Sequence, residues 1–135
     1  MKIRSDFVTN SSSTAFVLIK RTALTKEGMR TLLGIDDESP LTAIADALSE
    51  KLDEYGYPIE ERVGSYYDDP DTDSFLRRKM SDVVADKVRQ AQKQGHKVLM
   101  GTLSSDVDEI ETFLACDSFE LENDDYYLNA IECSW

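Results

Sequence analysis

The chain is sparse in the residues and segments that mark several classes of protein. Its 135 residues include two cysteines, one histidine, one tryptophan and three prolines. Two cysteines, Cys116 and Cys133, are few for a small secreted domain, so we expect a reduced, cytoplasmic setting. The alternative that the two cysteines form one disulfide stays open. No apolar stretch approaches the ~20 residues of a membrane-spanning helix, so no membrane association is expected. A single histidine cannot form a multi-histidine metal site, and neither a metal nor a cofactor is predicted.

Basic residues are scarce in two long blocks of the chain, and the net charge is −12. Residues 31–73 hold two basic and thirteen acidic groups, and residues 98–135 hold ten acidic groups with no lysine or arginine. The blocks 1–30 and 74–97 carry +4 and +5. Such alternation indicates internal charge complementarity and a solvated acidic surface. Because nucleic-acid binders are usually net basic, no direct nucleic-acid binding is expected.

What is present is enough apolar material for one folded domain spanning residues 1–135, since 41% of the chain is hydrophobic. The apolar runs at 15–20 and 97–103 lack alternation, which predicts strands buried on both faces. Helices at 39–55 and 73–94 are expected to pack against them. The sequence therefore predicts an α/β fold, with α+β open, as a single small domain having a mixed sheet of about 3–4 strands and about 4 helices.

Local signals place the remaining elements. Short helices are expected at 25–33 and 106–115, and strands near 119–121 and 126–133. Residues 56–70 show no clean period and are predicted to form a long loop. The long helix 73–94 has an apolar stripe at steps of three and four. Its members are Leu76, Met80, Val83, Val84, Val88 and Ala91.

The amino-terminal segment 1–14 is rich in serine and threonine. Six small polar residues, Thr9 to Thr14, lie between the apolar pair Phe7-Val8 and the run that begins at Ala15. The segment resembles the start of many short, functionally uncharacterised microbial and phage proteins, which open with Arg-x-x-Phe-Val-(Thr/Ser)-Asn-Ser-Ser-Ser. Here the pattern falls on Arg4, Phe7, Val8, Thr9, Asn10, Ser11, Ser12 and Ser13. The resemblance implies no known activity.

Two hydroxyl-rich places are candidates for ligand binding or recognition. In the first, Arg4, Asn10, Ser11, Ser12 and Ser13 could cradle phosphate through backbone N–H groups and hydroxyls. The same residues could instead form a structural turn, or an element that another protein reads or modifies.

The second place is Ser104 and Ser105, which follow a predicted buried strand and open a predicted helix. Free N–H groups there could receive an anion. The nearby acidic residues oppose an anion, however, and simple helix capping is the alternative reading of both serines.

The tyrosines are the remaining functional signal, and they support either an interface or the edge of a core. They occupy positions 55, 57, 66, 67, 126 and 127.

The sequence shows no assembled nucleophile or acid–base set, so no catalytic residue is predicted and enzymatic activity stays open. The first hypothesis is a non-catalytic interaction or regulatory module that presents an acidic, tyrosine-rich surface to a protein partner. The second is a small phosphate- or nucleotide-handling enzyme that uses the serine-rich amino-terminal turn. Oligomeric state has no sequence signal.

Overall fold

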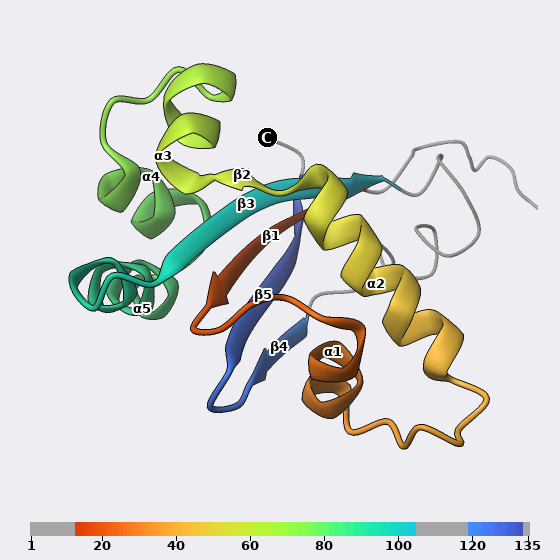
Figure 1. The fold of residues 1–135 in the computed structure, drawn as a ribbon. Coiled ribbons are helices and arrows are strands. Elements are labelled where there is room, and N and C mark those ends of the chain that lie inside the picture. Colours follow the sequence, from red (N-terminus) through yellow and green to blue (C-terminus); the bar gives the residue numbers. More distant parts are fainter. Residues whose placement is uncertain (1–12, 105–118, 134–135) are drawn as a thin grey trace, which may run out of the picture.

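A five-stranded sheet organises the part of the chain that the computed structural model describes, residues 13–104 and 119–133. Its spatial order is β2-β3-β1-β5-β4, and every described pairing is antiparallel (Figure 1). The strands are β1 (Ser13–Lys20), β2 (Tyr57–Pro58), β3 (Lys97–Ser104), β4 (Phe119–Glu122) and β5 (Tyr126–Cys133). The expected mixed sheet of 3–4 strands is therefore wrong in strand number and in its parallel content.

The central position of β1 follows from its composition. An uninterrupted apolar run gives both sides of the strand something to bury, so the strand is stable only where other elements cover both faces. Leu18 is 0% exposed, and Leu99 on the neighbouring strand β3 is half-buried and packs against the core. The prediction that both faces of these strands are covered is confirmed.

Helices cover the two faces of the sheet in two groups (Figure 1). On one face lie α1 (Lys26–Leu33) and α2 (Thr42–Tyr55), which pack on Phe16 and Leu18. On the other lie α3 (Ile59–Glu61), the π-helical turn η2 (Arg62–Tyr66), α4 (Thr72–Lys79) and α5 (Asp82–Lys93). This second group packs on Val17 and Ile19. The chain is thus an α+β fold, with five α-helices in its described residues where about four were expected.

Capping signals explain why α1 was predicted accurately. The Thr25 hydroxyl accepts a hydrogen bond of 2.9 Å from the backbone N–H of Gly28, which satisfies one of the open donors of the first turn. Gly34 ends the helix with φ of 71°, a left-handed conformation that glycine adopts without strain. The predicted helix 106–115 lies outside the described residues.

Two predicted segments differ from the structure. The expected helix 73–94 is two helices, because Ser81 interrupts it and accepts a hydrogen bond of 3.1 Å from Val84 N–H as the cap of α5. The expected loop 56–70 contains β2, α3 and η2. Among the described residues, no helix has the length and apolar character required to span a membrane.

Candidate functional site

The structure brings together two of the residues that the sequence singled out. Ser13, the first residue of β1, is the register partner of Ser104, the last residue of β3. On its other side Ser13 is in register with Cys133 of β5. Antiparallel pairing causes this, since the start of one strand then lies beside the end of its neighbours. The other candidates, Arg4, Asn10, Ser11, Ser12 and Ser105, lie outside the described residues.

The described surface is also hollowed where β2 leads into η2. The hollow has a volume of about 270 Å³ and is lined by Tyr57, Glu61, Arg62, Ser65 and Tyr66. We call these five residues the tyrosine–arginine recess. Of the tyrosines that the sequence left between interface and core, Tyr57 is 44% exposed and Tyr66 is 64% exposed. Tyr126 and Tyr127, in contrast, are buried in the core.

Arg62 lies at the centre of the recess, among three tyrosine rings. Its guanidinium carbon is 3.7 Å from the centroid of the Tyr66 ring, and 5.5 and 5.7 Å from those of Tyr57 and Tyr67. These distances are within the range of cation–π attraction. The Nη2 group donates a 3.0 Å hydrogen bond to Thr102 Oγ1 on β3. The side chain is therefore held on one side by an aromatic ring and at its tip by the sheet.

Buried side chains next to the recess explain how the segment holds this position. Ile59 and Val63, four residues apart, are both 0% exposed and belong to the core on the α5 face of the sheet. Tyr57 of β2 is in register with Met100 of β3, which ties the start of the segment to the sheet edge. Arg62 and Tyr66, also four residues apart, are left nearer the surface, Arg62 half-buried and Tyr66 exposed. π-helical turns are rare and frequently occur at functional sites.

One acidic side chain, Glu61, lines the recess, and Glu60 and Asp69 lie near it in the chain. Glu60 accepts a hydrogen bond from Gln92, and Asp69 is paired with Arg78, so both have partners. Glu61 is exposed and forms no ion pair with any residue in the described ranges. The lining of the recess thus contains one cation, Arg62, and one carboxylate, Glu61.

Sequence reasoning missed Arg62 and Thr102. A signal for Arg62 was present, because Arg62 and Lys51 are the only basic residues in the strongly acidic block 31–73, and Arg62 stands between tyrosines. Thr102 had no such signal. It is forty positions from Arg62 along the chain and meets it only because β2 pairs with β3.

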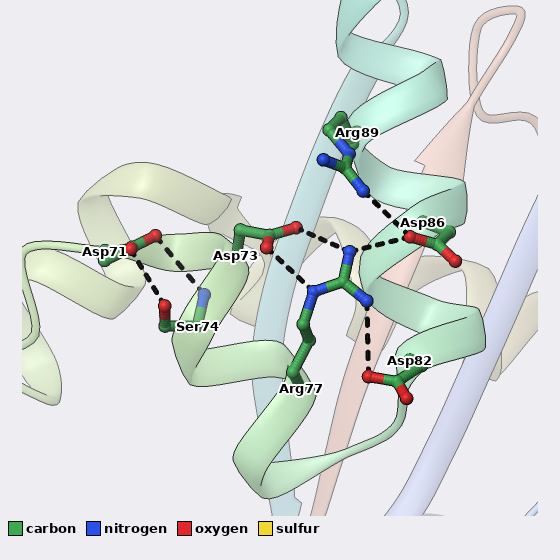
Figure 2. Close-up of polar contacts among 7 residues, drawn as sticks. All are labelled: Asp71, Asp73, Ser74, Arg77, Asp82, Asp86 and Arg89. Carbon is green, nitrogen blue, oxygen red and sulfur yellow. Dashed lines mark hydrogen bonds and ion pairs between the residues drawn. The ribbon is translucent and has the colours of Figure 1, made fainter.

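A second polar cluster joins α4 to α5. Figure 2 shows Arg77 of α4 between carboxylates of both helices, with hydrogen bonds of 2.8 Å to Asp73, 3.2 Å to Asp82 and 2.7 Å to Asp86. Arg89 also donates to Asp86, at 3.0 Å. The hydrogen bond from Arg77, followed by that from Arg89, holds the pKa of Asp86 below its usual range. Since these arginine donors already have acceptors, we interpret this cluster as a link between helices.

The Arg77 cluster predicts a pH dependence. A carboxyl group whose pKa is lowered on folding stabilises the fold above its unfolded pKa, and that stabilisation is lost as the pH falls through the lower, folded pKa. We expect R77M to lower Tm at pH 7. We expect the difference in Tm between R77M and wild type to shrink as the pH falls below about 4, the unfolded pKa of aspartate. Thermal unfolding from pH 7 to pH 2 measures this.

The matched control is K93M. Lys93 is an exposed cation on α5, the helix that carries Asp86, and has no ion pair with the described residues. Removing it changes the net charge equally but leaves the Arg77 contacts intact. A difference in Tm between R77M and wild type that stays constant with pH would contradict the assignment of Asp86 as a carboxylate stabilised by Arg77. An equal difference in Tm between K93M and wild type would contradict it as well.

Within residues 13–104 and 119–133, no three histidine, cysteine, aspartate or glutamate side chains are grouped so that they could hold a metal ion. Comparison of the chain with protein-family models, with curated proteins and with solved structures finds no match.

Proposed function

We propose that the protein is a non-catalytic interaction module and that the tyrosine–arginine recess is its contact surface for a partner protein. The observation that carries the proposal is the half-buried Arg62, positioned by Thr102 and stacked on the exposed ring of Tyr66. Tyrosine and arginine are enriched among the residues that dominate binding energy at protein interfaces. Sparse cysteine leads us to expect a cytoplasmic partner.

Preorganisation supports a binding role for these side chains. Association usually costs free energy because flexible side chains must be fixed at the interface. Arg62 is already fixed by its hydrogen bond to Thr102 and by the ring of Tyr66, so less of that cost remains when a partner binds. A tyrosine ring also offers a large contact area with only two rotatable bonds.

The size of the recess favours a protein partner over a large small-molecule ligand. Pockets that enclose drug-sized ligands typically measure about 300–1,000 Å³. The recess is about 270 Å³, which is just below that range. Such a volume suits one or two anchoring side chains, with the remaining contacts made by the surrounding surface.

Site-specific photocrosslinking tests this proposal. A photoreactive residue at Ser65, in the lining of the recess, is expected to form a covalent adduct with the partner in cells. The same residue at Val83, which is 56% exposed on α5, is the matched control and is expected to give none. The double variant Y57S/Y66S should abolish the Ser65 adduct. Equal adducts at both positions, or an adduct that persists without the two tyrosines, would contradict the proposal.

A second candidate function rests on the register of Ser13 with Ser104. Because the two hydroxyl-bearing positions lie on neighbouring strands, this end of the sheet could support phosphate or nucleotide handling. A ligand present at 100 times its Kd adds about 2.7 kcal/mol of stability. Thermal stabilisation by a nucleotide with Mg²⁺ that S13A/S104A removes would favour this function over the interaction module. A panel of nucleotides that leaves Tm unchanged would count against it.

A further inference from the structure

Arg62 differs from the other arginines of the described residues in having no carboxylate partner. Each of the others donates to at least one aspartate or glutamate within those residues: Arg21 to Glu122, Arg30 to Asp46, Arg77 to Asp73, Arg78 to Asp69 and Arg89 to Asp86. The chain has 27 acidic residues, so acceptors are abundant. Arg62 instead donates to the neutral hydroxyl of Thr102.

The hydrogen-bonding capacity of Arg62 is largely unused. A guanidinium carries five N–H donors. Nη2 reaches Thr102, while Nε is buried with no acceptor among the described groups. Nη1 also has no described acceptor, and it is not among the buried atoms. A guanidinium stacked on an aromatic ring keeps its N–H groups in its own plane, where a carboxylate can accept two of them side by side.

We propose that the tyrosine–arginine recess binds one carboxylate, presented by a single aspartate or glutamate that lies next to an apolar residue of the partner. The inference rests on the proposed function, since it names the chemistry that the recess recognises. Arg62 receives the carboxylate at the Nη1 edge of its guanidinium, because Nε is buried and Nη2 already donates to Thr102. The exposed rings of Tyr57 and Tyr66 contact the neighbouring apolar side chain.

The charges around the recess favour a carboxylate over a phosphate. Glu61 lines the recess, Asp68 and Asp69 follow η2 in the chain, and the whole chain carries −12. A phosphate dianion would double both the attraction to Arg62, the only cation of the lining, and the repulsion from these acidic groups; because the acidic groups outnumber Arg62, the net repulsion grows with the charge of the ligand. A lysine or arginine inside the recess is disfavoured because its charge would be placed beside that of Arg62.

NMR titration of the whole protein with short blocked peptides tests the inference. The probes are acetyl-Phe-Asp-Gly-amide and acetyl-Phe-Asn-Gly-amide. The two peptides differ only in that the side-chain carboxylate of the first is a neutral amide in the second. We expect saturable shifts of the Arg62 Nε–H and Thr102 signals with the aspartate peptide, and about tenfold weaker binding of the asparagine peptide. Equal binding of the two peptides, or no saturation with the aspartate peptide, would overturn the inference.

Two further peptides separate the alternative ligands. The same peptide with phosphoserine in place of aspartate is expected to bind more weakly than the aspartate peptide, and the lysine version is expected not to bind. If the phosphoserine peptide bound more tightly than the aspartate peptide, the recess would be assigned to phosphorylated partners. If the lysine peptide bound more tightly than the aspartate peptide, the recess would be assigned to basic partners. Either result would overturn the carboxylate assignment.

Conservative variants test the role of the guanidinium itself. R62K keeps the positive charge but loses the planar fork, so it should weaken binding of the aspartate peptide by about tenfold. R89K is the matched control, because Arg89 is already paired with Asp86 outside the recess, and it should leave binding unchanged. Equal binding by R62K and wild type would overturn the inference.

The proposed function and the carboxylate assignment can fail separately. A tyrosine-dependent adduct at Ser65, combined with equal binding of the aspartate and asparagine peptides, would leave the contact surface in place and reject the carboxylate. Selective peptide binding without any adduct at Ser65 would support the carboxylate site and reject the partner contact in cells.

Discussion

Replacing Gly101 with alanine is expected to destabilise the protein by roughly 3 kcal/mol, the upper end of the usual range for an overpacked core. A Cβ at this position of β3 would lie 2.1 Å from the backbone oxygen of Tyr55 and 2.8 Å from the ring of Phe16. A side chain can rotate away from such a contact, but a backbone oxygen at the end of α2 cannot. Urea unfolding of G101A against wild type measures the difference.

Two variants separate the contributions to this cost. G95A is the matched control, since Gly95 has φ of 77° but nothing within 4 Å of the added Cβ. It should cost about 1–2 kcal/mol from the left-handed backbone alone. In F16A/G101A, measured against F16A alone, the ring is gone but the Tyr55 oxygen remains, so the added alanine should cost less than in wild type but more than zero. A cost for G101A no larger than that for G95A would show that the strand and the helix can separate without loss.

The close approach at Gly101 also shapes the recess. Tyr55, which ends α2, is two residues before Tyr57, and Gly101 is adjacent to Thr102. The contact of α2 with β3 is therefore close in the chain to both Tyr57 and the hydroxyl that holds Arg62. We expect a larger residue at position 101 to disturb the geometry of the recess as well as the stability of the core.

Elements with a local cause could be predicted from the sequence. The strand at 15–20 follows from its own apolar run, and α1 follows from the capping hydroxyl of Thr25 and from Gly34. The recess could not be predicted in the same way. It depends on the register of Tyr57 with Met100 and on a π-helical turn that places Arg62 against Thr102. Both are products of tertiary packing between segments about forty residues apart.

The break between α4 and α5 shows how a periodic pattern can hide a boundary, and the prediction that Val83 belongs to the apolar stripe is wrong, because Val83 is 56% exposed. Leu76, Val84 and Val88 are all buried, so the apolar stripe continues across the break although the helix does not. The signal that outweighs the stripe is Ser81 followed by Asp82, a capping hydroxyl and an acidic first-turn residue. Starting a new helix at Asp82 also fixes which of the adjacent valines faces the core.

V84A is therefore expected to cost roughly 1–3 kcal/mol, through lost burial and the cavity that remains. V83A is expected to change stability by no more than about 0.5 kcal/mol, as surface substitutions usually do. Val84 is 1% exposed and packs with the core on the α5 face of the sheet, whereas Val83 is 56% exposed. The two variants remove the same atoms from neighbouring positions of one helix, so the change in helix propensity is the same in both. The difference between their free energies of unfolding in urea therefore measures the contribution of burial. Equal costs would mean that α5 does not begin at the Ser81 cap and that its stripe faces a different direction.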